Sequence, residues 1–205
     1  MTLKEIILFL SDEDQRIIRD MMALYEDIDR QTLNFAGKTG LHCQSGCSTC
    51  CRNPDIETTV AEMMPAAALL WAQSLAERQL EILRTKDDKG ICVFYQPEAS
   101  ASENAGCCSI YAYRPGLCRL FGFSARPDKY GKPLLVTCKM IKESQPQGAL
   151  TTCGAPLLND HALRVRDIDP AGAGKLWPIN QAIGMALEKV GFGVDRGLMG
   201  KNLQQ

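Results

Sequence analysis

The stretch that most constrains the fold is Cys43-Gln44-Ser45-Gly46-Cys47-Ser48-Thr49-Cys50-Cys51, because four of its nine residues are cysteine. The whole chain has 205 residues and contains ten cysteines. A free cysteine can fill a hydrophobic core as a small apolar residue, but a core does not require four of them among Gly, Ser and Thr. Thiolates that converge from one short loop are instead typical of a metal site. The run therefore predicts metal binding.

Disulfide bonds are the other common use of many cysteines, and they form in oxidising compartments. The N-terminal apolar stretch spans only Ile6 to Leu10, and acidic residues follow where a secretory signal has a longer apolar core and a cleavage site. No run approaches the roughly 18 to 20 apolar residues that span a bilayer. We therefore expect a cytoplasmic protein whose thiols stay reduced.

Length and composition favour one compact domain over residues 1–205. About 100 to 200 residues is the usual size of a domain, and 45% of the residues here are hydrophobic. The 23 basic and 24 acidic residues give a net charge of −1. This balance offers no electrostatic basis for binding nucleic acid or an anionic membrane surface. We expect neither a nucleic acid nor a membrane as a partner.

Two long helices are predicted in the first half of the chain. Apolar residues recur at helical spacing over about residues 12–36, and the segment 37–40 with its two glycines ends this helix. Thr59-Val60-Ala61-Glu62 has the pattern of a capping box, and the Ala- and Leu-rich stretch that follows extends to Lys86. Pro65 is expected to kink this second helix or to mark a restart, because proline lacks the backbone N–H and clashes with the preceding turn.

The rest of the chain predicts a small irregular β region and one more helix. Between residues 90 and 140 the sequence changes to short apolar runs such as 91–94 and 108–111, which predict short strands or extended segments. A helix is expected over about residues 178–190, ended by a glycine, before a loosely held tail at residues 195–205. The predicted fold class is mainly α with a small irregular β region.

The cysteine segments, taken together, resemble a known family. Cys43-x3-Cys47-x2-Cys50-Cys51 is followed by Gly90-Ile91-Cys92 and then by Cys108-Ser109-Ile110-Tyr111-x2-Arg114-Pro115-x2-Cys118-Arg119-x-Phe121. This ordered pattern resembles the CxxCxxCC family of zinc- or iron-chelating cysteine cluster proteins, from residue 43 to about residue 121. The resemblance implies a single domain organised around a cysteine-rich metal-binding core at about residues 41–140, with helical additions at both ends.

The resemblance also implies a set of metal ligands. Family members commonly carry a further cysteine downstream of the Cys-Arg segment, and Cys138 is preferred over Cys153 for that place. Cys107 and Cys108 form a vicinal pair that the family pattern does not require. We favour Cys108 because it precedes Ser-Ile-Tyr at the family spacing, with Cys107 as a buried thiol or one beside the ligands. The expected metal ligands are Cys43, Cys47, Cys50, Cys51, Cys92, Cys108, Cys118 and Cys138.

Counting thiolates favours two metal sites. A tetrahedral zinc ion or a cubane iron–sulfur cluster takes four thiolates, and the expected set supplies eight. Vicinal Cys50 and Cys51 point in different directions in extended backbone, so that each can face a different site. A single site with several spare thiols is the alternative.

The spacing of the first three cysteines favours iron over zinc. Cys43-x3-Cys47-x2-Cys50 resembles the cluster-binding triad of radical SAM enzymes, although a predicted helix precedes it here where those enzymes have the first strand of a β/α barrel. Zinc sites more often use pairs of cysteines separated by two residues, and only Cys47 and Cys50 form such a pair. We therefore expect one or two iron–sulfur clusters, such as the 4Fe-4S type, with zinc as the alternative cofactor.

Three further residues are expected beside the cofactor. Arg114, Arg119 and Tyr111 lie close in sequence to expected ligands, and donors or cations next to cluster sulfurs tune the reduction potential. The alternative is that Arg114 binds backbone carbonyls of its loop and that Tyr111 belongs to the core. Apolar surroundings for the cofactor are expected from Phe94, Phe121 and Phe123.

Other candidate sites are weaker. His42 precedes Cys43, but neighbouring side chains in extended backbone point apart, so solvent or a carbonyl is its expected partner. His161 has no companion at ligand spacing. Gly172-Ala173-Gly174-Lys175-Leu176 lacks the first glycine of a phosphate loop and the Ser or Thr after its lysine. A cysteine hydrolase would need a Cys paired with a base His, which two isolated histidines do not suggest.

These observations predict a cysteine-cluster metalloprotein. The leading hypothesis is an iron–sulfur protein that acts in electron transfer or as a redox component of a modifying system, with metal ions and a protein redox partner as its partners. The alternatives are a zinc-stabilised interaction module and a metal chaperone or storage protein. Flagellin lysine methylases carry a similar cysteine cluster within larger chains, but this sequence shows no recognisable methyl-donor pocket. No catalytic residue is predicted.

Overall fold

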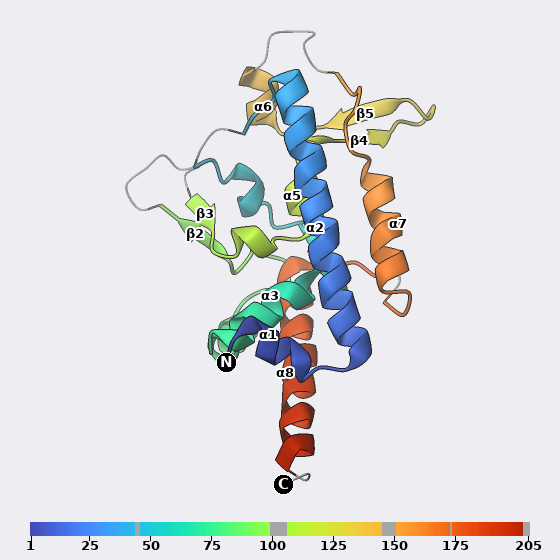
Figure 1. Ribbon diagram of the computed structural model, residues 1–205. Coiled ribbons are helices and arrows are strands. Elements are labelled where there is room, and N and C mark those ends of the chain that lie inside the picture. Colours follow the sequence, from blue (N-terminus) through green and yellow to red (C-terminus); the bar gives the residue numbers. More distant parts are fainter. Residues whose placement is uncertain (44–45, 99–105, 145–150, 173, 203–205) are drawn as a thin grey trace. The chain divides into compact units, whose positions relative to one another are not determined.

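The computed structural model describes residues 1–43, 46–98, 106–144, 151–172 and 174–202 (Figure 1). Helices dominate these residues and the strands are short, which confirms the predicted fold class. The strands of the described residues form antiparallel pairs, namely β1 (Glu57–Thr58) with β6 (Trp177–Pro178), β2 (Tyr95–Pro97) with β3 (Gly106–Cys108), and β4 (Ser124–Pro127) with β5 (Pro133–Val136). None of the described helices is both long enough and apolar enough to cross a membrane.

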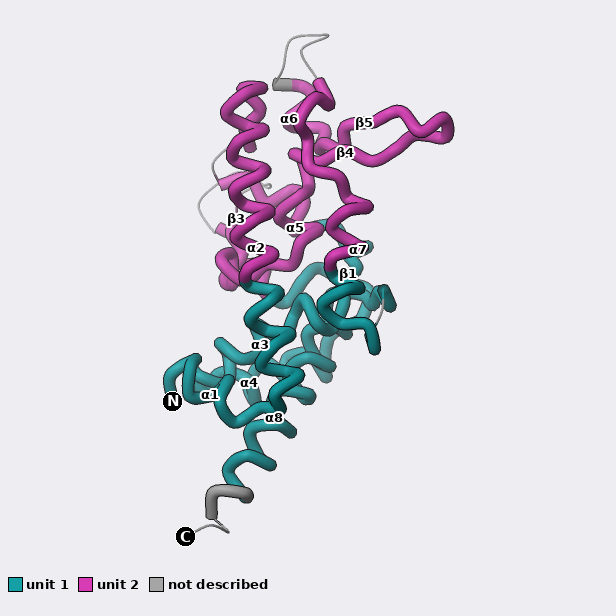
Figure 2. Tube along the Cα trace, turned by 45° about the vertical axis from the view of Figure 1, so that its right-hand side comes forward, with its two compact units in different colours: residues 1–22, 53–93, 165–205 teal, residues 23–52, 94–164 magenta. Residues whose placement is uncertain are grey.

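The chain divides into two compact units (Figure 2). Unit 1 comprises residues 1–22, 53–93 and 165–205, and unit 2 comprises residues 23–52 and 94–164. Nine of the ten cysteines belong to unit 2, and the remaining one, Cys92, belongs to unit 1. That the whole chain forms one domain around a cysteine-rich core stays a prediction.

The long helix predicted over residues 12–36 is confirmed as α2 (Asp12–Thr39), which contributes residues to both units. The Ser11 hydroxyl accepts a hydrogen bond from the Asp14 N–H at 3.2 Å, which caps the first turn. Gly40 follows the helix at φ 71°, in the left-handed region where glycine has no steric cost. The helix thus delivers the chain directly into the cysteine run.

Unit 1 is a set of helices around an apolar core. Helix α3 (Val60–Ala72) packs chiefly against α8 (Ile179–Asn202). Helices α1 (Leu3–Leu8) and α4 (Ala76–Arg84) pack against α3 and α8, respectively. Nine of the 13 residues of α3 are buried. Such burial of apolar side chains supplies most of the stability of a helical unit.

The predicted capping box begins α3, and the helix continues past Pro65. The Thr59 hydroxyl accepts the Glu62 N–H at 3.2 Å, and the Glu62 carboxylate accepts the Thr59 N–H at 3.1 Å. The restart predicted at Pro65 is wrong, because α3 continues through it to Ala72, and Ser74, which has φ 58°, lies between α3 and α4. The kink predicted at Pro65 stays a prediction. Proline removes one backbone hydrogen bond here, and the burial of the residues around it outweighs that loss.

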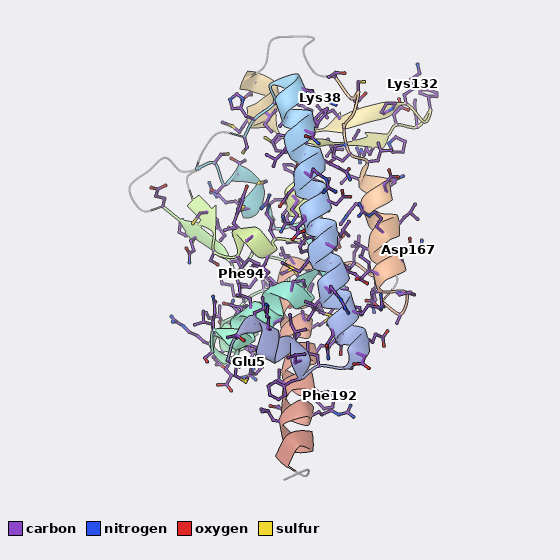
Figure 3. All side chains as sticks on the ribbon, viewed as in Figure 1. Glu5, Lys38, Phe94, Lys132, Asp167 and Phe192 are labelled. Atoms are coloured by element: carbon purple, nitrogen blue, oxygen red, sulfur yellow. The ribbon has the colours of Figure 1, made fainter. Side chains whose placement is uncertain are left out.

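The predicted end of the last helix at Gly191 is also wrong. Helix α8 continues to Asn202, so most of the tail predicted at residues 195–205 is helical, and residues 203–205 lie outside the described residues. A Cβ at Gly191 would lie 2.4 Å from Trp71 Cζ2, so this glycine permits close packing of α8 on α3. The next residue, Phe192, is 64% exposed (labelled in Figure 3).

Unit 2 is more irregular and consists of short elements around the second half of α2. The strand expected at residues 91–94 is a turn, and the one expected at 108–111 ends at Cys108. A small apolar cluster of Phe35, Leu41 and Ile141 lies in this unit. Its helical elements besides α2 are η1 (Thr49–Arg52), η2 (Tyr111–Tyr113), α5 (Gly116–Leu120), α6 (Lys139–Ser144) and the first part of α7 (Leu158–Ile168).

Candidate metal centre

All ten cysteines are free thiols, so none of them forms a disulfide bond. Among the described residues, no group of three or more His, Cys, Asp or Glu side chains is arranged to hold one ion directly. The thiols of unit 2 instead interact through hydrogen bonds and through their charges. These interactions define two overlapping groups of four.

The first group, called the Cys43 group, consists of Cys43, Cys47, Cys50 and Cys138. Cys43 follows the end of α2, and Cys47 and Cys50 lie before and within η1. Although Cys43 as a residue is exposed, partial burial and then the charges of the other three thiols together raise the pKa of its thiol to about 11. Each of the other three thiols is therefore close enough to Cys43 to repel its thiolate, and a bound cation would relieve this repulsion.

The second group, called the Cys51 group, consists of Cys50, Cys51, Cys108 and Cys118. The Cys51 S–H donates a hydrogen bond to the Cys50 sulfur, and this bond raises the pKa of Cys51. Burial and the charges of the other three thiols of the group also raise the pKa of Cys51. Burial also raises the pKa of Cys108. The group brings together segments η1, β3 and α5, and Cys50 belongs to both groups.

Cys50 is the thiol best prepared to be a thiolate. The Cys51 S–H and the backbone N–H groups of residues 50 and 51 donate hydrogen bonds to its sulfur, and with the charge of Arg114 they lower its pKa to about 6 despite burial. Cys50 and Cys51 are neighbours within the 3-10 turn η1, which keeps both N–H groups close to the Cys50 sulfur. Since thiolates rather than thiols bind metals, this lowered pKa favours Cys50 as a ligand, and its role as a ligand stays a prediction.

Backbone N–H groups also point at two other sulfurs. The Ile141 N–H donates to Cys138 Sγ at 3.4 Å, so that this thiol caps the first turn of α6. The Ile110 N–H donates to Cys108 Sγ and opposes the rise in its pKa. Such N–H donors stabilise thiolates and set the potential of metal–sulfur centres. The sequence analysis predicted no helical turn after either cysteine and so gave no signal for these donors.

The structure separates Cys107 from Cys108. Both lie in β3, where successive side chains point to opposite faces of the strand pair. Cys107 is exposed, with its sulfur 3.8 Å from Gln96 Oε1, so the expectation that it is buried is wrong. Cys153 is exposed as well, and its N–H donates to the Thr151 hydroxyl at 3.2 Å.

Cys92 belongs to unit 1, where a buried amide fixes its loop. Asn180, on α8, accepts the Val93 N–H at 3.0 Å and donates to the carbonyls of Asp87 and Ile91 at 3.3 Å each. These hydrogen bonds bracket Cys92 and hold its backbone in one conformation. The sequence analysis missed Asn180, because no motif marks an asparagine so distant in the chain. That Cys92 is a ligand stays a prediction.

Arg114 is the arginine that acts on the thiols. Its charge lowers the pKa of Cys50 and opposes the rise in the pKa of Cys108. It also donates to the Tyr111 carbonyl at 2.8 Å and lies 3.8 Å from the centroid of the Tyr111 ring. Tyr111 is 64% exposed, so its alternative role as a core residue is wrong. The alternative that Arg114 binds a loop carbonyl is confirmed, in addition to its charge effect.

Arg119 binds the backbone of the segment between Cys108 and Cys118. It is almost fully buried, its Nε donates to the Arg114 carbonyl at 2.9 Å and its Nη2 donates to the Ala112 carbonyl at 2.5 Å. Its Nη1 forms an ion pair with Asp29, and its guanidinium lies 4.4 Å from the centre of the Tyr25 ring. These contacts stabilise the segment between Cys108 and Cys118. Contact of Arg119 with a cofactor stays a prediction.

The two histidines do not join the thiols in the described interactions. His42 Nδ1 lies 3.0 Å from the Gly40 carbonyl, as expected for a residue that points away from the site. The His161 ring occupies the space that a Cβ of Gly116 would need, at 2.0 Å, and so fits closely against the start of α5. Sequence reasoning missed this packing, which makes Gly116 necessary two residues before Cys118.

Of the three phenylalanines expected around the cofactor, Phe123 packs beside an expected ligand. Phe94 is buried (labelled in Figure 3), and Phe121 is half-buried. Phe123 packs with Cys138 against the cluster of Phe35, Leu41 and Ile141. These contacts leave Cys138 partly shielded from water, as expected for a ligand of a metal–sulfur centre.

Comparison with known proteins assigns the chain to a family. The family model CxxCxxCC, described as a putative zinc- or iron-chelating domain, matches residues 42–146. The chain therefore belongs to this family, which confirms the resemblance seen in its cysteine pattern. The matched segment includes Cys138 and ends before Cys153. No curated protein and no solved structure matches the chain. The protein is thus a metal-binding cysteine protein of the zinc- or iron-chelating type.

Proposed function

We propose that the cysteines hold one or two iron–sulfur clusters and that the protein acts in electron transfer or as a redox component of a modifying system. The observation that carries this proposal is the number of interacting thiols. The Cys43 and Cys51 groups together contain seven different cysteines, whereas one zinc ion takes four. Seven thiols linked in this way suit cluster binding better than a single zinc site.

The two groups suggest how the ligands divide. Cys43, Cys47, Cys50 and Cys138 would hold one centre. Cys51, Cys108 and Cys118 would hold the other, with Cys92 as the eighth ligand on the sequence pattern alone. The vicinal pair Cys50-Cys51 then contributes one thiolate to each centre. A cluster bound there would supply one-electron redox chemistry.

Polar contacts around the thiols support a redox role. Reduction potentials of iron–sulfur centres depend on hydrogen bonds to the sulfurs, on nearby charge and on solvent exposure. The chain offers each of these, through the N–H groups that point at Cys50, Cys108 and Cys138, the cation Arg114 and the exposed Cys43. Exposure at Cys43 would also leave one edge of the centre open to a protein redox partner.

A zinc-stabilised interaction module is the second candidate function. Cys47 and Cys50 are separated by two residues and end in the 3-10 turn η1, whose N–H groups donate to Cys50 Sγ. Paired cysteines with this spacing are typical of zinc sites. In that case chelation would unfold the metal-bound part of the chain, and the protein would have no redox chemistry.

The metal and sulfide content of anaerobically purified protein tests the proposal. We expect a brown protein that contains iron and an equal amount of acid-labile sulfide and that loses its visible absorption on exposure to air. A colourless protein with full zinc occupancy would contradict the iron–sulfur proposal and support the second candidate. Cys107→Ser is the matched control for Cys50→Ser, because Cys107 points away from Cys108. We expect the first variant to keep its iron and the second to lose most of it.

A further inference from the structure

Helix α8 buries one face within unit 1 and exposes the other to solvent. On the packed face, the side chains of Leu187, Val190 and Val194 are buried. On the other face, Phe192 is 64% exposed and Met199 is 66% exposed. Figures 1 and 2 both show the C-terminal turns of α8 extending past α3. The exposed face of α8 therefore carries large apolar side chains.

These apolar side chains follow one another at a fixed spacing. Met185, Phe192 and Met199 are seven residues apart, which is close to two helical turns, so they form one stripe along the helix. The stripe is about 21 Å long, at 1.5 Å per residue. Met185 is half-buried and the other two residues are exposed. A spacing of seven residues is the one at which helices pair along their length.

Charged residues border this stripe, with one sign of charge on each side. At about 100° per residue, Glu188 and Asp195 lie about 40 to 60° from Phe192 on one side of the helix. Lys189 and Arg196 lie at the same angles on the other side. All four charged residues are exposed. Each acid precedes a base by one residue, so the two borders carry opposite charges at nearly the same height along the axis.

A second copy of this face is complementary to the first when the two helices run parallel. The twofold axis then lies along the helices, and the acidic border of one copy faces the basic border of the other. Glu188 lies opposite Lys189 of the second copy, and Asp195 lies opposite its Arg196. In an antiparallel pair, acidic borders would face each other and basic borders would do the same. Repulsion between like charges disfavours that arrangement.

We propose that the exposed stripe of α8 is a dimer interface, at which two copies of this chain pair their α8 helices in parallel through Met185, Phe192 and Met199. This inference goes beyond the proposed function and does not depend on metal binding. The charges favour a second copy over a helix of another protein, because the face is complementary to itself.

The small size of the stripe makes this a weak dimer. Each copy contributes two exposed apolar side chains and four charged ones, which is at the low end of interface sizes. Lys189 Nζ also lies 3.0 Å from Asp14 Oδ1, but the Lys189 side chain is 43% exposed and so stays accessible to a second carboxylate. We expect a dissociation constant in the micromolar range or above.

Sedimentation velocity of the full-length protein, in a concentration series up to about 1 mM, tests this inference. A reductant prevents disulfides between exposed thiols such as Cys107. We expect a reversible equilibrium between monomer and dimer that shifts toward monomer at high salt. Phe192→Ser should weaken dimerisation about 10-fold or more, as for an aromatic residue at the centre of an interface. Leu176→Ser is the matched control and should have no effect, because it changes a 55% exposed leucine of unit 1 outside α8.

Two charge-reversal variants test the parallel orientation. Asp195→Lys places basic residues on both borders of one turn, and Arg196→Glu places acidic residues on both. We expect each variant alone to dimerise about 5-fold or more weakly at low salt, because the twofold axis repeats each like-charge contact. An equimolar mixture of the two variants should dimerise as tightly as the wild type, because each copy then faces a partner of opposite charge.

Three results would overturn the inference. A wild type that stays monomeric over the whole series excludes the dimer and leaves the stripe for a helix of another protein. Phe192→Ser dimers as tight as those of the wild type exclude this face as the interface. A mixture no tighter than its separate variants excludes parallel pairing. Circular dichroism checks folding, and should Phe192→Ser not fold, the two charge variants and their mixture decide.

Discussion

Units 1 and 2 are stabilised by different kinds of contact. Unit 1 contains 21 of the buried hydrophobic residues described, and unit 2 contains 10. Unit 2 instead contains nine of the ten cysteines and the buried arginine Arg119 with its carbonyl and carboxylate partners. Apolar burial stabilises a helical unit without further help, whereas a unit of short elements with few buried apolar side chains is the kind that a metal stabilises.

This difference implies that the stability of unit 2 should depend on bound metal and that the stability of unit 1 should not. Neighbouring thiol charges raise the pKa of Cys43, Cys51 and Cys108, so that in the absence of a cation these groups oppose close approach as thiolates. A bound metal turns this repulsion into attraction. Nothing in the α3–α8 core of unit 1 depends on such a charge.

The largest expected effect follows from removing the metal. Structural zinc sites contribute about 10 to 16 kcal/mol of apparent binding free energy, and loss of such a term exceeds the stability of most domains. We expect a strong chelator to remove amide hydrogen-exchange protection from residues 94–144 of unit 2 while α3 and α8 stay protected. Hydrogen exchange with mass spectrometry measures this. Equal loss of protection in α3 and α8 would contradict the contrast between the units.

A core substitution in unit 1 should have the second largest effect. Leu187 on α8 is fully buried, and Leu8 on α1 is 68% exposed. We expect Leu187→Ala to lower the free energy of unfolding by about 2 to 5 kcal/mol, because it removes buried methyl groups and leaves a cavity. Leu8→Ala is the control and should change it little. Urea unfolding measures both, and metal content per folded protein should be the same in the two variants.

The sequence predicted the presence of the helices better than the positions of their ends. The capping box at Thr59 and the periodicity of residues 12–36 indicated helices correctly, because these signals are local. The ends of α3 and α8 were predicted wrongly. Gly191 was interpreted as a helix end, but it lies inside α8, where the Trp71 side chain leaves no room for a Cβ. Local patterns cannot show which distant side chain will fill a gap.

At the candidate site the sequence identified the thiols better than their partners. The order and spacing of the cysteines indicated the family, which is confirmed, whereas the preference for Cys108 over Cys107 as a ligand stays a prediction. Asp29 and Asn180 were missed because each acts across more than 80 residues of chain. Only folding reveals which polar side chain reaches a distant loop.

Two helical glycines provide a smaller test, one from each unit. A Cβ at Gly191 would collide with Trp71, whereas nothing lies within 4 Å of one at Gly37 on α2. We expect Gly191→Ala to destabilise the protein by about 1 to 3 kcal/mol through overpacking. Gly37→Ala should instead stabilise it by about 0.5 to 1 kcal/mol, because alanine loses less conformational entropy in a helix. Thermal unfolding of the metal-loaded proteins compares them, and destabilisation by both would argue against this packing.

The smallest expected effect concerns Asp27 and depends on pH. Hydrogen bonds from Arg164 and then from Arg30 and Gln31 hold the pKa of Asp27 below its ordinary value of 3.8, although burial opposes this. A lowered folded-state pKa adds stability above the unfolded pKa that is lost as the pH falls through the folded value. We expect Asp27→Asn to cost about 0.2 to 1 kcal/mol at pH 7, less at high salt. The difference should vanish below the folded pKa, and urea unfolding across this range checks it; a constant difference would exclude an electrostatic cause.

The most direct test of the central claim is to ask which thiols the metal protects. The metal-loaded protein is treated with an alkylating reagent, then digested and analysed by mass spectrometry, with metal-free protein as the control. We predict that Cys107 and Cys153 react in both samples. The thiols predicted to be protected only in the loaded sample are Cys43, Cys47, Cys50, Cys51, Cys92, Cys108, Cys118 and Cys138. Equal modification of all ten cysteines in a sample that still contains its metal would contradict the account.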